Sequence, residues 1–219
     1  MKRVAYLALL LVLVGAFWNT WLLYPLKLLV VFFHEASHAL TTLLTGGAVK
    51  ELVIIPAQGG HVISMGGNRF LALSSGYLGS LLWGGLVYLL AVTTRKDRGV
   101  MLCLAIFILC ITLYTMSPFT NSFGFFFCLM TGLFMVFSAR KLSHGFNDFV
   151  LRLVGLTSMV YAPLDIISDT LVRSELRSDA RMLAEEFGGT TVFWGTLWVL
   201  LSLFFVGWII RWGFKYEKH

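Results

Sequence analysis

The sequence predicts an all-α membrane protein: a polytopic bundle of about six to seven transmembrane helices with a small β-hairpin after the second span. Hydrophobic residues make up 58% of the 219 residues. Only 13% of the residues are charged, about half of the roughly 25% that is usual in soluble domains. Apolar runs of about 20 residues, enough to cross a bilayer as a helix, follow one another along the chain. We expect a single domain over residues 1–219.

The first two spans are expected near residues 4–25 and 27–45. No charged residue occurs between Arg3 and Lys27. No small-residue cleavage site follows the first apolar run, so we interpret it as a retained span and not as a signal peptide. Gly46-Gly47 ends the second span, as glycine commonly does after a helix C-terminus.

The segment 48–66 has a different pattern and predicts a β-hairpin. The stretch 48–56 is short and rich in β-branched residues, and Ala57-Gln58-Gly59-Gly60 is typical of a turn. Residues 61–65 are expected as the return strand. The exposed edge of such a hairpin can hold an extended peptide by adding it as a further strand. The alternative is that the hairpin is a simple connector.

The remaining apolar runs predict five more spans, broken by loops with charges or by Ser117-Pro118. A charged, helical surface segment is expected from Arg173 to Glu186. Seven spans place the two termini on opposite sides of the membrane. Basic residues divide almost evenly between the two sets of loops, so they indicate no orientation. The five spans are expected near residues 70–93, 99–116, 121–139, 150–172 and 190–210.

Charge and cysteine content exclude several classes of function. The net charge is +6, but the basic residues flank apolar runs, which is typical of membrane anchors and not of a nucleic-acid surface. The expected surroundings are therefore a lipid bilayer, with no nucleic-acid partner. Three cysteines, Cys103, Cys110 and Cys128, lie in apolar runs without a C-x-x-C pattern, and they indicate neither disulfides nor a metal site.

The second span contains His34-Glu35-Ala36-Ser37-His38, an H-E-x-x-H motif inside an apolar stretch. On a helix, residues i and i+4 share one face, so His34 and His38 are placed to bind one metal ion together. Glu35 then lies beside the ion and can take a proton from a water molecule. Because ionisable residues are costly at membrane depth, they indicate a functional site.

A catalytic zinc ion usually has three protein ligands, so a third must come from elsewhere in the chain. Asp165 and Asp169 lie in the sixth span, one helical turn apart, and Pro163 before them bends the helix. Asp169 has an alternative role, an ion pair with Arg173. Other candidates stand outside that span: His61, His144, Asp148 and His219. Three polar residues stand within apolar runs: Ser37, Thr41 and Asn121. They are expected either to line a water route to the metal site or to hydrogen-bond to neighbouring helices.

These motifs resemble the site-2 protease family of intramembrane zinc metalloproteases, in a B-like branch that lacks PDZ and CBS domains. The resemblance rests on residues 34–47, on Gly76-Tyr77-Leu78-Gly79, on Leu164-Asp165 and on Ser178-Asp179-Ala180. It covers residues 34–79 and 161–180. The resemblance implies that the ion is Zn²⁺, that Asp165 is its third ligand beside His34 and His38, and that Glu35 is the general base.

The resemblance further implies an intramembrane zinc metallopeptidase, an integral, multi-pass protein that hydrolyses peptide bonds of membrane-embedded protein substrates. The main alternative is a catalytically inactive membrane scaffold or chaperone that keeps the metalloprotease fold. A zinc-dependent enzyme acting on lipid, or a transporter, is a third class. A transporter is expected to carry charged residues along several spans, whereas here they cluster on two.

Overall fold

The computed structural model describes residues 2–173 and 177–218 and shows a helical bundle with one hairpin. The predicted fold class, an all-α membrane protein with a small β-hairpin after the second apolar segment, is confirmed. Its elements are α1 (Lys2–Ala16), α2 (Tyr24–Leu44), β1 (Ala48–Ile55), β2 (Gly59–Met65), α3 (Arg69–Thr93), α4 (Asp97–Thr115), α5 (Ser122–Lys141), α6 (His144–Ile167), the π-helical turn η1 (Ser168–Val172), α7 (Asp179–Phe187) and α8 (Thr191–Tyr216).

Among the described residues, five helices are long and apolar enough to cross a membrane: α3, α4, α5, α6 with η1, and α8. The 21 residues of α2 are also sufficient in length. Its His34, Glu35 and His38 lower its hydropathy, which is the cost of placing ionisable groups in an apolar helix. The five helices match the positions of the last five predicted spans.

The first predicted span, residues 4–25, is not one helix. The helix α1 ends at Ala16, turns follow, and Pro25 stands in the first turn of α2, where its fixed backbone suits a helix start. In the intervening turn, the hydroxyl of Thr20 donates to the carbonyl of Phe17 at 2.7 Å, which competes with helix continuation.

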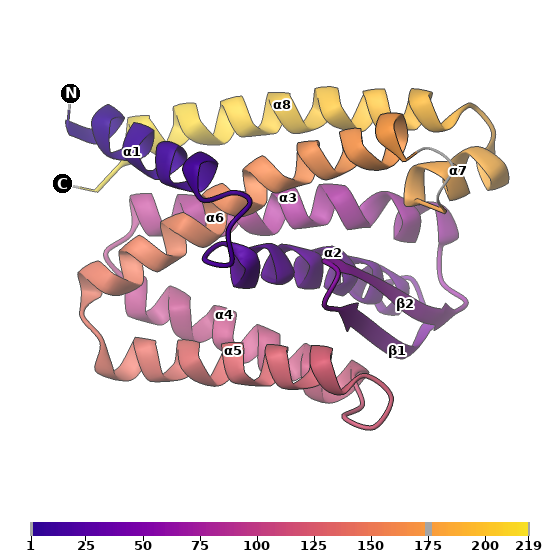
Figure 1. Cartoon of the computed structure of the whole chain (residues 1–219), viewed down its shortest axis with the longest axis horizontal. Coiled ribbons are helices and arrows are strands. Elements are labelled where there is room, and N and C mark those ends of the chain that lie inside the picture. Colours follow the sequence, from indigo (N-terminus) through magenta and orange to yellow (C-terminus); the bar gives the residue numbers. More distant parts are fainter. Residues whose placement is uncertain (1, 174–176, 219) are drawn as a thin grey trace.

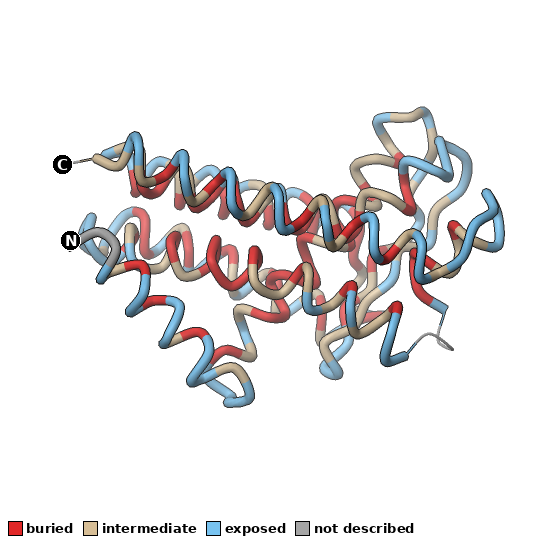
Figure 2. Tube along the Cα trace, turned by 90° about the horizontal axis from the view of Figure 1, so that it is seen from above, coloured by how far each residue is buried: buried red, intermediate tan, exposed pale blue. Residues whose placement is uncertain are grey.

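This break changes where the chain ends lie. The helices α1 and α2 run one after the other in the same direction, and both termini lie at the same end of the bundle (Figures 1 and 2). This arrangement differs from the seven separate spans from which opposite sides were expected for the termini. The C-terminal Lys218 amide donates to the carbonyl of Val92 at 2.8 Å, close to the last turn of α3.

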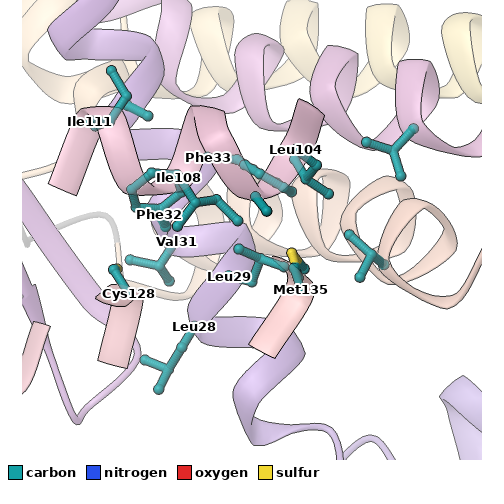
Figure 3. Packing of buried hydrophobic residues seen from close by; sticks show 14 of the residues in the cluster. Leu28, Leu29, Val31, Phe32, Phe33, Leu104, Ile108, Ile111, Cys128 and Met135 are labelled. Atoms are coloured by element: carbon teal, nitrogen blue, oxygen red, sulfur yellow. The ribbon is translucent and has the colours of Figure 1, made fainter. Parts of the chain in front are cut away.

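The helix α2 lies at the centre of the bundle. Its residues Leu28, Phe32 and Phe33 are fully buried and pack in one cluster with Ile108 of α4 and Met135 of α5 (Figure 3). Between helices in a membrane, such contacts stabilise the fold through van der Waals packing. The motif helix is therefore held rigidly by its neighbours.

Helices α3 and α6 approach each other closely through small residues. A β-carbon added at Gly155 would lie 2.8 Å from the carbonyl oxygen of Gly84, and the hydroxyl of Ser158 donates to the carbonyl of Ser80 at 2.7 Å. Small residues serve such close contacts in membrane helices. This contact sets the distance between the two helices that border the site.

The hairpin pairs β1 with β2 in antiparallel register, from Ala48 opposite Met65 to Ile55 opposite Gly59, with a bulge between Val49 and Glu51. It packs on α2, and β1 also borders α4 and α5. The hydroxyl of Tyr24 donates to the carbonyl of Pro56 at 2.7 Å. The hairpin is thus fixed against the motif helix.

Candidate metal centre

His34 and His38 lie one turn apart on α2, and their rings are 4.8 Å apart between centroids. Both Nε2 atoms face the same carboxylate oxygen, Oδ2 of Asp179, at 3.0 Å from His34 and 3.1 Å from His38. The three side chains are 16%, 12% and 9% exposed, in the order His34, His38, Asp179. The structure therefore brings two histidines and an aspartate together in a largely buried group.

Asp179 begins α7, a nine-residue helix between α6 and α8. The side chain of Ser178 accepts a hydrogen bond from the amide of Arg181 and caps this helix. Burial raises the pKa of the Asp179 carboxyl, but His38 and His34 outweigh that effect and hold it well below its usual range. The carboxylate stays ionised, which is the form that binds a metal ion.

The donor set and its geometry fit a zinc site. The three ligand atoms all lie within 4.8 Å of one another, and ligands held about 2.0–2.1 Å from an ion at tetrahedral angles lie roughly 3.3 Å apart. Nδ1 of His38 lies 2.7 Å from the carbonyl oxygen of Ala72, which can only accept, so Nδ1 carries the hydrogen. With Nδ1 engaged in this way, Nε2 would be the nitrogen that supplies its lone pair to a bound ion, as zinc-binding histidines require.

Gly76 of α3 leaves the space that an ion would need. A β-carbon added there would lie 2.4 Å from Nε2 of His34, 2.5 Å from Nε2 of His38 and 2.7 Å from Oδ2 of Asp179. Any side chain at this position would fill the space among the three donor atoms. The structure therefore places this glycine at the candidate metal centre.

Glu35 is buried, 5% exposed, and faces the hairpin. A β-carbon added at Gly60 of β2 would lie 2.9 Å from Oε1 of Glu35, so only a glycine lets the strand pass this close. The Glu35 carboxyl lines the same cavity as the two histidines. It lies beside the metal-binding group without belonging to it.

The structure brings Asp179, and not Asp165, to the two histidines. Asp165 of α6 lines the same cavity but is not one of the three groups whose ligand atoms converge. Asp169 accepts from the hydroxyl of Tyr77 at 2.6 Å and pairs with Arg173 at 2.6 Å, in agreement with its alternative role. The signal for Asp179 was present in the Ser178-Asp179-Ala180 stretch, but its position outside a span concealed its role.

The other candidates stand apart from the group. His61 of β2 lines the cavity, while Asp148 pairs with Arg152 and Lys218 near the far end of α3. His144 begins α6, and His219 lies outside the described residues. None of the residues suggested for a water route lines the cavity: Ser37, Thr41 and Asn121.

The cavity has a volume of about 450 Å³ and extends from the metal-binding group along β2. Its walls come from α2, the hairpin, the first turns of α3, the end of α6 and the residues before α7. Arginines line it as well: Arg69, Arg173 and Arg177. The strand β2 forms one wall, and Glu35 and the two histidines open onto the same space.

These features define a class: a helical integral membrane protein with a buried group of two histidines and an aspartate on an H-E-x-x-H helix. The model of the family described as Peptidase M50B-like matches residues 6–209, and the chain belongs to this family. The resemblance to the site-2 protease family is confirmed. Neither the curated proteins nor the solved structures gave a match to the chain.

Proposed function

We propose that this protein is an intramembrane zinc metallopeptidase that hydrolyses peptide bonds of membrane-embedded protein substrates. The observation that carries the proposal is the convergence of His34, His38 and Asp179 beside the buried carboxyl of Glu35. The family match to peptidases supports the same chemistry.

In this proposal His34, His38 and Asp179 hold the zinc ion, with Asp179 in the place first expected for Asp165. The ion supplies Lewis acidity, which polarises a carbonyl and makes a water molecule more acidic. The carbonyl of Ala72 keeps His38 in the tautomer that binds metal. Tyr77 packs edge-on against the ring of His34, with centroids 4.8 Å apart, and limits its rotation.

Glu35 acts as general base and then as general acid. It follows His34 in the helix, about 100° further round, so its carboxyl reaches the cavity without competing for the ligand positions. It accepts a proton from the attacking water and passes a proton to the nitrogen of the leaving amine. Its low exposure protects this proton transfer from bulk water.

The hairpin is proposed to hold the substrate in an extended form. Helical membrane segments have their carbonyls in hydrogen bonds, so a scissile bond must leave the helix before it is cleaved. The strand β1 is covered by α4 and α5, whereas β2 lines the cavity. An added strand on β2 would pass Gly60 and therefore Glu35.

The test compares the parent with Glu35→Gln in membranes of cells that produce either chain. Glutamine keeps the shape of the side chain but cannot accept the proton, and we expect cleavage to fall by about 10²–10⁴-fold. Membrane-protein fragments that appear only with the parent are identified by proteomics, and zinc is quantified on both purified proteins. Both proteins should contain about one zinc per chain, as such one-ion sites do.

The same comparison separates the peptidase from an inactive scaffold. If Glu35→Gln yields the same fragments as the parent, the peptidase proposal is wrong. It is also wrong if Glu35→Gln restores function in cells that lack the protein as fully as the parent does. If the purified parent contains no zinc, the proposed metal site is wrong as well.

A further inference from the structure

The proposed metal centre depends on a helix that is too short to be stable by itself. Isolated helices shorter than about 12–15 residues are marginal in water, and α7 has nine residues. Only three of them are buried: Asp179, Ala180 and Leu183. The position of the third ligand is therefore set by the contacts that α7 makes with other elements.

The first turn of α3 provides a polar contact for α7. Nε of Arg69 donates to both carboxylate oxygens of Glu186 at 3.2 Å, and its second guanidinium nitrogen donates to Oε1 at 3.1 Å. The same nitrogen lies 3.3 Å from the sulfur of Met182. Forked contacts of this kind fix orientation as well as distance.

Apolar contacts complete the interface. Phe70 of α3 packs edge-on against Phe187 of α7, with centroids 5.3 Å apart. Leu183 is fully buried in a cluster that includes Leu73 and Tyr77 of α3 and Trp198 of α8. These contacts hold α7 against α3 and α8.

Helix α3 also positions the rest of the site. Within two turns of Arg69 it presents the Ala72 carbonyl to His38 and the open space at Gly76 to all three donor atoms. A shift of α7 along α3 therefore moves Oδ2 of Asp179 relative to groups that do not move with it. The register of α7 on α3 decides whether the three donors meet.

We propose that metal binding and the docking of α7 are one coupled equilibrium, and that the Arg69–Glu186 ion pair is a positioning contact that tunes the affinity for the ion. The inference rests on the proposed metal site. The ion ties Asp179 to α2 and so holds α7 in place, and by linkage any contact that holds α7 in place strengthens ion binding by the same factor.

The affinity test uses the full chain in detergent and zinc alone as the probe, measured by competition with a chelator. Glu186→Gln removes the ion pair to α3, and Glu185→Gln is the matched control because the ion pair of Glu185 is with Arg181 inside α7. The Arg69–Glu186 pair is 47% and 37% exposed, so we expect zinc binding to weaken about two- to fivefold. The double exchange Arg69→Glu with Glu186→Arg should recover most of this loss.

Hydrogen exchange of the α7 amides gives a second readout that does not depend on catalysis. Zinc should slow exchange across residues 179–187 of the parent at least about tenfold, since the ion stabilises the docked helix. Asp179→Asn should abolish this protection. Equal zinc affinity in Glu186→Gln and Glu185→Gln, or zinc binding without slower exchange in α7, would overturn the coupling while leaving the metal site intact. A parent that binds no zinc would overturn the metal site itself.

Discussion

The two halves of the candidate metal centre are built in opposite ways. His34 and His38 come from one turn of α2, a helix packed on several sides by other elements. Asp179 comes from α7, which is 145 residues further along the chain than His34 and has a mostly polar surface. Spacing within a rigid helix is enough to place the first half, whereas the second half depends on how a small helix docks.

This contrast predicts how each half responds to damage. Residues around the histidines are held by aromatic packing, including Phe33 stacked on Trp83 with centroids 6.3 Å apart. The α7 half includes the forked Arg69–Glu186 ion pair and the apolar contacts of Leu183. Removing one of the three proposed ligands should strongly reduce zinc affinity in either half. Small changes in packing should reduce zinc affinity more when they are made in the α7 half.

The largest effect on zinc is expected from Asp179→Asn, compared with Asp165→Asn. Loss of partners that only support ligands costs about 10–100-fold in metal affinity, so loss of Asp179 as a ligand should exceed about 100-fold. Asp165→Asn should change affinity less than about threefold on the same scale. Chelator competition on both purified proteins measures this, and the reverse order would restore Asp165 as the third ligand.

Gly76→Ala tests whether the space between the two halves is needed. The added methyl would lie within 2.4–2.7 Å of all three donor atoms, closer than van der Waals contact allows, so we expect zinc affinity to fall at least about tenfold. Gly207→Ala on α8 is the control, because its β-carbon meets nothing within 4 Å. Full zinc content in Gly76→Ala would show that the ion does not bind among these atoms.

The smallest effect on zinc is expected from Lys218→Ala, at the other end of α3. Its ammonium group lies 2.6 Å from Asp97 and 2.9 Å from Asp148, and the neighbouring Glu217 pairs with Arg152 at 2.8 Å. Charged hydrogen bonds of this kind contribute about 1.5–3 kcal/mol. Thermal unfolding in detergent should therefore begin several degrees lower, with zinc affinity unchanged. A parallel loss of zinc would show that the two ends are coupled.

Local sequence pattern determined much of this protein. The apolar runs predicted the five long helices because each run is long enough to cross a bilayer, and the β-branched segment followed by turn residues predicted the hairpin. The i, i+4 spacing of His34 and His38 predicted that the two side chains share one helix face. These features depend on residues close in the chain, so they can be recognised without knowing the fold.

Only the tertiary structure decided the rest. The contact of Asp179 with the two histidines joins residues about 140 apart, and no local period encodes such a contact. Asp165 was expected as the third ligand because Leu164-Asp165 resembles the family pattern, but the docking of α7 brings a different carboxylate to the two histidines. Gly76 likewise resembles any packing glycine until the three donor atoms are seen around it. Sequence spacing placed the two histidines on one helix face, and packing between helices brought Asp179 to them.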